Sequence, residues 1–405
     1  MRKIDLIYGG VMLKTELINR VNELKRKLEL QSLDSYIVTD EYDIWYFTNL
    51  TYKPEERPFF LIISQQDNPV LIVPKLEESH VNKSVLDCEI ITYWDYPSPL
   101  NENWYDVFNQ FIKKYDRVGI ENNVKTNIFQ HIHVKELVPS QFVSEQRKVK
   151  SDFEVKEIKR SAHVSSEAMK TIFKSIYKGA SVIEPFALSR QIQTNLIRSK
   201  QFDPITTSLL TAVWAAPISS MPHSVPNLDD RLGSGPNVAM AYFRINGYSS
   251  ECERTFFLEK PTSEEEELFN HMMIAREKSL NLLKPGIKVS DVDSEARNYL
   301  IKNSFKNNLL HRTGHGVGVQ NHEAPFLAEG SDDVLKENMI ITIEPGIYID
   351  QVGGYRHSDT ILITKDGFEI LTDAPQELSE LIIKKPNRLA KLKGKIMKRA
   401  LKIDK

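Results

Sequence analysis

The sequence has few cysteines and no long apolar run. Its 405 residues include two cysteines, Cys88 and Cys252, too few for a disulfide framework or a thiolate zinc site. This usage predicts a reducing, cytoplasmic location. No stretch of about twenty apolar residues occurs, so we expect no membrane-spanning helix. Residues 1–13 are interrupted by Asp5 and a Gly-Gly pair and lack a small-residue cleavage pattern, so we expect a frayed end or edge segment instead of a signal peptide.

An excess of charge of either sign is also missing. The formal net charge is -2, with 27% charged and 41% hydrophobic residues, which is ordinary for a soluble globular protein. Net charge therefore argues neither for nor against an acidic partner, and nucleic acid is not the expected one. A chain of 405 residues exceeds the size at which one hydrophobic core stops growing, which predicts two domains.

The first third of the chain predicts alternating helices and strands. Residues 13–31 place apolar side chains on one helical stripe. Four apolar or β-branched runs predict strands, at residues 35–39, 59–64, 69–73 and 118–121. Together these elements predict a small α/β domain over residues 1–147.

A second domain is predicted over residues 148–375. It begins with a helix at residues 151–177, where Ser151 as N-cap and Glu154 three residues later form a capping-box pattern. Long helical patterns then alternate with strand patterns such as NVAMAYFRI, MIITIEPGIYI and TILIT.

Residues 376–405 predict a basic C-terminal tail. From Lys384 onward it carries about ten Lys and Arg against the single Asp404, and apolar residues recur at near-helical spacing, at Leu389, Leu392, Ile396 and Ile403. One interpretation is a solvated amphipathic helix or a disordered end. The other is a contact to nucleic acid, an anionic membrane or a partner helix.

Four segments carry the functional signal. They are Met221-Pro222-His223, residues 247–257 (GYSSECERTFF), residues 311–326 (HRTGHGVGVQNHEAPF), and residues 343–348 (IEPGIY) with 353–360 (GGYRHSDT). Their order and spacing resemble the creatinase/prolidase family of M24-type proteins, which includes Xaa-Pro dipeptidase and aminopeptidase P. The resemblance implies an α/β (α+β) fold, a creatinase-like N-terminal domain followed by a pita-bread domain, and a hydrolase.

The resemblance also implies a degenerate metal site. Family peptidases hold two divalent metals with two Asp, one His and two Glu. The matching positions here are Met240 and Glu251 for the Asp pair, His315 for the His, and Glu344 and Ser358 for the Glu pair. Met is a poor ligand for metals that prefer oxygen, and the Ser hydroxyl is neutral. The site is therefore expected to hold either one divalent ion (Mn, Co or Zn) through Glu251, His315 and Glu344, or none.

The polar shell around this site is retained. In the family's peptidases, residues matching His223, His311, His322 and Arg356 line the active site, and Tyr348 also matches. The resemblance assigns catalysis to His223, Glu253, His322 and Glu344, and substrate binding to Arg57, His311, Tyr348 and Arg356.

Glu251 and Glu253 need a physical explanation. In a strand, residues at i and i+2 point to the same face, and in the family fold that face looks toward Glu344. Three clustered carboxylates cannot all stay ionised without a compensating cation. The cation is a metal or a positive group of the substrate, unless one carboxylate is protonated.

Creatinases provide the metal-free precedent. They use a His to transfer protons and Glu residues to hold a guanidinium group, and their Glu-Arg-Thr motif matches residues 253–255. Arg57-Pro58 resembles the creatinase Arg-Pro that reaches into the neighbouring subunit, which would require a homodimer. However, His322 is followed by Glu-Ala-Pro-Phe, the peptidase form.

His357 and Asp359 match neither pattern. In a strand they point away from the face of Arg356 and Ser358, so His357 would replace the lost Glu only if the strand shifted register. We expect a surface or packing role for both.

Three functions remain open. The first is a hydrolase of a C–N bond in a small substrate, with a dipeptide carrying Pro in second place as the default. The second is a metal-independent, creatinase-like amidinohydrolase acting on a cationic small molecule. The third is a catalytically inactive binding module, which the retained histidines and Arg356 oppose.

Overall fold

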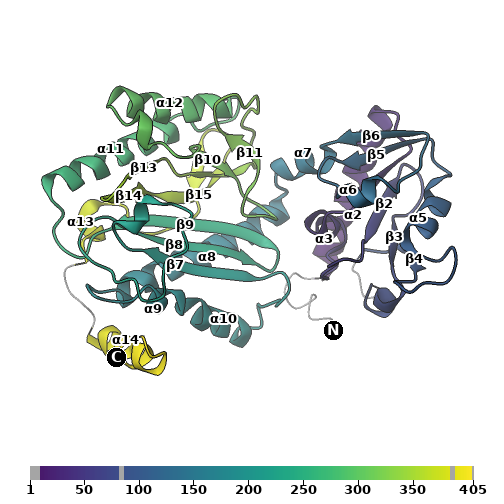
Figure 1. The fold of residues 1–405 in the computed structure, drawn as a ribbon. Coiled ribbons are helices and arrows are strands. Elements are labelled where there is room, and N and C mark those ends of the chain that lie inside the picture. The colour runs from purple at the N-terminus through teal and green to yellow at the C-terminus, as the bar shows by residue number, and fades with distance from the viewer. Residues whose placement is uncertain (1–9, 82–85, 384–387, 404–405) are drawn as a thin grey trace. The chain divides into compact units, whose positions relative to one another are not determined.

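The computed structural model describes residues 10–81, 86–383 and 388–403. Most of the expected frayed end (residues 1–9) and parts of the basic tail (384–387 and 404–405) lie outside the described residues, whereas residues 10–13 form the first turn of a helix. The chain divides into two compact units, Met1–Arg147 and Lys148–Lys405 (Figure 1).

The first unit contains a mixed six-stranded sheet with the order β4-β3-β2-β1-β5-β6. β1 pairs antiparallel with β2 and parallel with β5. Its core is formed by apolar strand residues such as Ile37, Phe60 and Val118 packed against helix residues such as Phe108. Its elements are α2 (Gly10–Leu30), β1 (Ser35–Val38), α3 (Glu41–Thr48), β2 (Phe60–Ser64), β3 (Val70–Pro74), η1 (Lys75–Glu77), α4 (Glu78–Val81), β4 (Glu89–Tyr93), α5 (Trp104–Ile112), β5 (Arg117–Glu121), α6 (Thr126–Phe129), β6 (Glu136–Ser140) and α7 (Phe142–Lys148).

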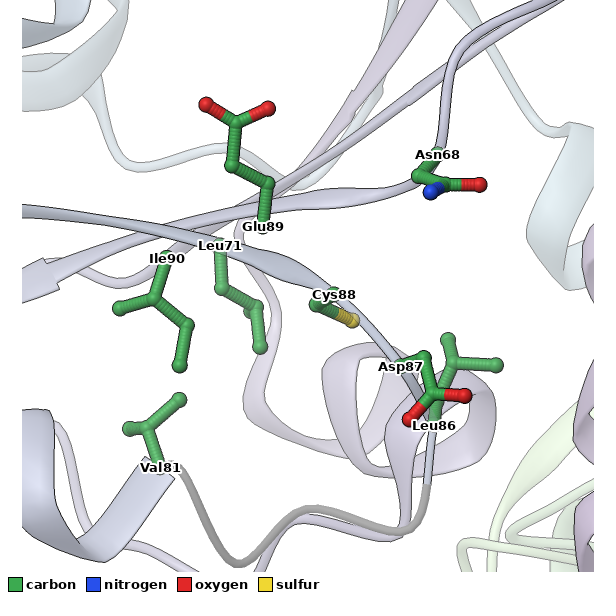
Figure 2. A pocket seen from close by; sticks show the side chains of 8 residues that line it. All are labelled: Asn68, Leu71, Val81, Leu86, Asp87, Cys88, Glu89 and Ile90. Atoms are coloured by element: carbon green, nitrogen blue, oxygen red, sulfur yellow. The ribbon is translucent and has the colours of Figure 1, made fainter.

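A pocket of about 400 Å³ lies beside β3 and β4 (Figure 2). Leu71, Val81 and Ile90 form its apolar part, and Cys88 also lines it. Burial raises the pKa of the Cys88 thiol to about 12. Because the thiolate is the reactive form of cysteine, this shift disfavours reaction at Cys88.

The second unit is built on a larger antiparallel sheet with the order β11-β10-β12-β15-β9-β8-β7, where β16 also pairs with β15. A separate ribbon is formed by β13 and β14. Its elements are α8 (Asp152–Ser175), α9 (Ile183–Phe186), α10 (Leu188–Arg198), β7 (Ser208–Trp214), η2 (Ile218–Ser220), β8 (Asn237–Ile245), β9 (Tyr248–Phe256), α11 (Ser263–Leu280), α12 (Val289–Lys302), η3 (Lys306–Asn308), β10 (Gly314–Gly316), β11 (Glu323–Leu327), β12 (Ile340–Ile343), β13 (Gly346–Ile349), β14 (Gly353–Arg356), β15 (Ser358–Ile363), β16 (Phe368–Ile370), α13 (Leu378–Leu381) and α14 (Arg388–Ala400).

Helix α8 covers one face of this sheet by packing on β8 and β9 (Figure 1). Its start confirms the predicted capping box, because Ser151 accepts from the Glu154 backbone and Glu154 reaches back to the Ser151 N–H. Ser250 of β9 points toward α8, where its hydroxyl lies 2.8 Å from that of Ser161. Even-numbered residues of β9 therefore face the helices, and odd-numbered residues face the opposite side of the sheet, called here the open face.

No helix within the described residues is long and apolar enough to cross a lipid bilayer.

Candidate active site on the open face of the sheet

Strand β9 presents two acidic side chains on the open face. Glu251 and Glu253 are two residues apart, as the alternation of a strand requires for side chains on the same face. Both are buried, with 3% and 4% of their surface exposed. Burial of two neighbouring carboxylates is costly unless charge or hydrogen bonds compensate them, so their partners decide what this face can do.

The strands on either side of β9 place neutral residues next to Glu253. Met240 of β8 and Ser358 of β15 lie directly opposite Glu253 in the two ladders. These are the positions where the resemblance implied metal-binding carboxylates. The Ser358 hydroxyl donates a 2.6 Å hydrogen bond to Glu251 Oε1, so it satisfies a carboxylate without adding charge.

His315 completes a compact donor group with Glu251 and Glu344. His315 lies in β10, and Glu344 directly follows β12, the neighbouring strand. His315 Nε2 lies 3.1 Å from Glu344 Oε1 and 3.7 Å from Glu251 Oε2. Its Nδ1 lies 3.1 Å from the Gly316 carbonyl oxygen, which only a protonated Nδ1 can satisfy. Nε2 is thereby directed at the two carboxylates.

The proton content of this group compensates its negative charge. Burial raises the pKa of Glu251 to about 8, with a further contribution from Glu344, and burial also raises the pKa of Glu253 to about 7. Burial opposes charge on Glu344 and His315 too, but their hydrogen bond and opposite charges lower the pKa of Glu344 to about 2 and raise that of His315 to about 9. Without an added cation, the group therefore holds protons at neutral pH.

Arg356 forms an ion pair with the second acidic side chain of β9, Glu253. Its Nη2 donates to Glu253 Oε1 at 2.8 Å, and its Nε lies 2.5 Å from Glu253 Oε2. Arg356 Nη1 donates to the Tyr348 hydroxyl at 3.1 Å, and this hydroxyl lies 2.8 Å from His311 Nε2. Since His311 Nδ1 lies 2.7 Å from the Arg312 carbonyl oxygen, Nδ1 carries the proton and Nε2 accepts from Tyr348. The side chains of Glu253, Arg356, Tyr348 and His311 thus form one hydrogen-bonded series, in which each member finds a partner.

Two histidines lie at the rim of the site. The ring of His322, which is partly exposed, packs against that of His315 with centroids 3.9 Å apart. Partial burial and the charge of His315 lower the pKa of His322 to about 4, so its imidazole is neutral at pH 7. His223 is exposed on the loop after η2 and is close enough to affect the pKa values of both His311 and His322. Both rim imidazoles are available as hydrogen-bond donors or acceptors.

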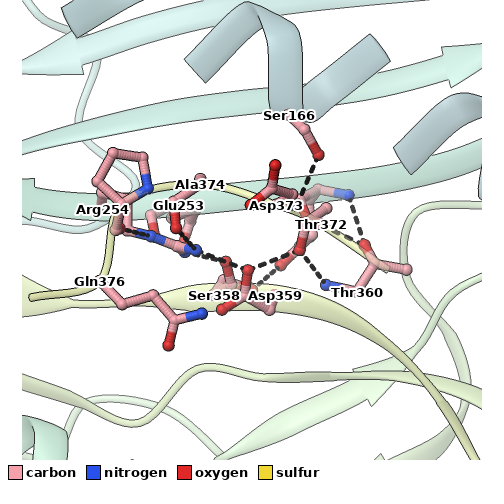
Figure 3. A network of polar contacts seen from close by, with 12 residues as sticks. Ser166, Glu253, Arg254, Ser358, Asp359, Thr360, Thr372, Asp373, Ala374 and Gln376 are labelled. Carbon is pink, nitrogen blue, oxygen red and sulfur yellow. Dashed lines mark hydrogen bonds and ion pairs between the residues drawn. The ribbon is translucent and has the colours of Figure 1, made fainter. Parts of the chain in front are cut away.

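The other face of β9 buries a second charged cluster (Figure 3). Arg254 Nη2 donates to Asp359 Oδ1 at 2.8 Å, and Arg276 of α11 pairs with Asp359 Oδ2. Thr372 Oγ1 also donates to Asp359, at 2.6 Å. His357 is fully buried on this side against the ring of Phe269. Asp359 and His357 therefore lie away from the open face, as the strand alternation implied.

The remaining predicted residue, Arg57, lies in the first unit. Its guanidinium pairs with Asp95 at 2.5 Å and with Glu56 at 2.8 Å. Its assignment to substrate binding stays a prediction.

The donor set has the chemistry to hold one divalent ion. His315 Nε2 faces Glu344 Oε1 and Glu251 Oε2, and carboxylate and imidazole ligands within 4.8 Å of one another can be drawn from Glu251, His315 and His322, or from Glu251, Glu253 and Glu344. Mixed O and N donors suit Mn, Co or Zn. A second ion would need ligands at Met240 and Ser358, which offer a thioether and a neutral hydroxyl, while Arg356 already neutralises Glu253.

Two features of the site were not anticipated from the sequence. These are the hydrogen bond from Ser358 to Glu251 and the ion pair between Arg356 and Glu253. The partners in each pair are more than 100 positions apart in the chain. No local pattern indicates such pairs, because only the packing of β9 against β15 and the end of β14 brings them together.

Comparisons with known proteins agree with this architecture. Residues 156–365 match the model of metallopeptidase family M24, and residues 20–177 match that of the creatinase/prolidase N-terminal domain. An uncharacterized peptidase of Staphylococcus aureus (strain MW2) is 30% identical over 363 residues, which cover 88% of this chain and 99% of the relative.

Solved structures show the same fold. The prolidase from Pyrococcus horikoshii OT3 is 25% identical with a TM-score of 0.75, and the Xaa-Pro dipeptidase from Bacillus anthracis is 25% identical with a TM-score of 0.74. Each match covers 89% of this chain and 99% of the other. The predicted α/β fold, with a creatinase-type N-terminal domain and a pita-bread domain, is confirmed.

Proposed function

Because the chain belongs to metallopeptidase family M24, a family of hydrolases, we propose that it cleaves the C–N bond of a small dipeptide substrate with one divalent ion instead of two. An Xaa-Pro dipeptide is the proposed substrate, on the strength of the resemblance to Xaa-Pro dipeptidases. The predicted domains, residues 1–147, 148–375 and 376–405, are part of this proposal. So are a homodimer and a cytoplasmic location.

The observation that carries the proposal is the convergence of Glu251, His315 and Glu344. The buried carboxylate of Glu251 and the partly exposed carboxylate of Glu344 lie within 3.7 Å of the Nε2 atom of a buried histidine whose Nδ1 is held by a backbone carbonyl. Such an outer hydrogen bond orients the ring of a metal-ligating histidine. These three residues would hold the ion, which when bound would lower the pKa of a water molecule and polarise the scissile carbonyl.

The surrounding residues would bind and orient the substrate. His322 is neutral at pH 7 and lies against His315, so its N–H can donate to an oxyanion that develops on the carbonyl. His223, exposed at the same rim, would supply a second donor or transfer a proton. Tyr348, Arg356 and His311 would act as one hydrogen-bonded unit that shapes the substrate side of the pocket.

The creatinase-like alternative requires a different state of Glu253. In that mechanism Glu253 would grip a cationic group of the substrate, but Arg356 already forms a two-point ion pair with it. A guanidinium substrate would have to displace Arg356 from a buried position. This pair favours the dipeptidase proposal over the amidinohydrolase.

Metal analysis combined with a hydrolysis assay tests the proposal. We expect purified protein to bind one Mn, Co or Zn ion per chain and to hydrolyse an Xaa-Pro dipeptide in a chelator-sensitive reaction. His315→Ala should lose both ion and activity, whereas His271→Ala, on α11 and outside the site, should keep both. Hydrolysis by metal-free protein would contradict the one-ion mechanism, and absence of any amide hydrolysis would favour the binding-module alternative.

A further inference from the structure

The basic tail contains a helix whose two sides differ in exposure. α14 spans residues 388–400, and residues 388–403 contain seven Lys or Arg and no acidic residue. The match to the M24 family ends at residue 365. α14 therefore lies outside the region that matches the family.

One side of α14 packs against the second unit. Gly394 lies so close to the Glu184 carboxylate and the Tyr177 hydroxyl that a side chain at this position would collide with both. One turn later, Lys398 is buried, with its Nζ 3.7 Å from Glu184 Oε1. Positions four apart share a helix face, so the face of Gly394 and Lys398 holds α14 against the protein.

The opposite side of α14 exposes large apolar side chains. Leu389, Leu392 and Ile396 follow the spacing of one helical stripe, and they are 66%, 56% and 61% exposed. Lys395 and Arg399 flank this stripe on one side and Lys393 on the other, and all three are exposed. The seated helix thus presents an apolar strip bordered by cations.

This combination selects among the possible partners. Nucleic acid would use the cations but would leave the apolar strip in water. A second copy of α14 would cover the strip but would bring two cationic helices together. An anionic bilayer surface satisfies both features, since apolar side chains enter the headgroup boundary while Lys and Arg contact lipid phosphates.

We propose that α14 is an interfacial helix that binds anionic lipid surfaces through Leu389, Leu392, Ile396 and the flanking cations. The helix lies in the plane of the membrane surface and does not span it. Its seat on Glu184 and Tyr177 keeps the second unit attached at the membrane. This proposal goes beyond the hydrolase activity and does not depend on it.

Vesicle flotation of the full chain tests the proposal. We expect binding to vesicles of phosphatidylcholine with phosphatidylglycerol and none to phosphatidylcholine alone. Leu392→Gln/Ile396→Gln removes the apolar strip but keeps the charge, and Lys393→Glu/Lys395→Glu reverses the charge but keeps the strip. Each double variant should weaken binding at least about tenfold.

Matched controls separate this site from general surface effects. Leu30→Gln/Leu76→Gln changes two leucines of the first unit that are 80% and 61% exposed, and Lys113→Glu/Lys125→Glu reverses two exposed lysines there; both should bind vesicles like the wild type. Equal losses in variants and controls, or no binding to anionic vesicles, would overturn the proposal. A change from dimer to monomer in Leu392→Gln/Ile396→Gln without vesicle binding, or binding to RNA alone, would also overturn it.

Discussion

The two faces of strand β9 both bury charged side chains, but they compensate the charge differently. On the helix-covered face, Arg254 uses its guanidinium on Asp359 and on the carbonyl oxygens of Pro375, Glu253 and Ser358. Asp359 is itself held by two arginines and Thr372. On the open face, three carboxylates meet one arginine and one histidine.

The difference separates a structural network from a functional one. On the helix-covered face, the Asp359 carboxylate finds all of its partners within the chain (Figure 3), while Arg276 Nε and both ring nitrogens of His357 are buried without a hydrogen bond to any described residue. On the open face, Arg356 balances one carboxylate, and the raised pKa values of Glu251 and His315 indicate that protons balance the rest. A buried group that keeps protons for lack of a cation is a candidate ligand set.

The largest expected effect is on the helix-covered face. Asp359→Asn leaves Arg254 and Arg276 buried without their carboxylate, which should lower the free energy of unfolding by about 3–5 kcal/mol. Chemical denaturation measures this. The matched control is Asp373→Asn, whose side chain is 89% exposed and pairs with Lys170; it should cost less than about 1 kcal/mol. A similar loss of unfolding free energy in Asp359→Asn and Asp373→Asn would contradict a structural role for the buried cluster.

The second prediction makes the open face resemble a two-metal site. Met240→Asp/Glu253→Thr/Ser358→Glu places carboxylates at the two neutral positions and removes the partner of Arg356. We expect the bound metal to rise from one to two ions per chain, because the ligands of the second ion are restored. Elemental analysis after dialysis measures the stoichiometry. Met240→Leu, which adds no ligand, serves as the control, and an unchanged stoichiometry in the triple variant would count against the assignment.

The third prediction concerns pH. The folded-state pKa values of His315 and Glu251 are raised to about 9 and about 8, so between about pH 5 and 9 these two groups bind more protons in the folded state than in the unfolded state. The stability linked to these groups is present at low pH and is lost as pH rises through the raised pKa values. For metal-free protein in the presence of a chelator, the free energy of unfolding should fall by on the order of 1–3 kcal/mol from pH 6 to pH 9.

Adding metal should remove this dependence, because the ion replaces the protons. Glu251→Gln removes one titrating group and should flatten the profile of the chelated protein. A chelated wild type whose stability rises with pH over this range would refute the assigned protonation.

The smallest expected effect concerns the hydrogen-bonded series that links Glu253 to His311 through Arg356 and Tyr348. Tyr348→Phe removes the hydroxyl that links Arg356 to His311, at a cost of about 1 kcal/mol. We expect a higher KM with a smaller change in kcat, because the unit shapes the substrate side. Tyr242→Phe, whose ring also borders the site next to His322, is the control. An unchanged KM in Tyr348→Phe would show that Tyr348, Arg356 and His311 do not act together in substrate binding.

Much of the local structure could be predicted from the sequence. The capping box of Ser151 and Glu154 and the common face of Glu251 and Glu253 follow from short-range spacing. For the basic tail, the sequence leaves an amphipathic helix, a disordered end and a binding contact open, and it does not indicate that the helix packs on Glu184. That packing depends on Gly394, since only a residue without a side chain allows so close an approach.

The sequence by itself determined which chemical groups are present and to which face of a strand they point. It showed that Met240 and Ser358 offer no charge where the family places carboxylates, and that Glu253 adds one. Only the tertiary structure decided how these groups pair. Alternation along a strand is a local property of the backbone, whereas Arg356 meets Glu253, and Ser358 meets Glu251, through the packing of segments more than 100 residues apart. Those pairings leave Glu251, His315 and Glu344 as the group that we propose holds a cation.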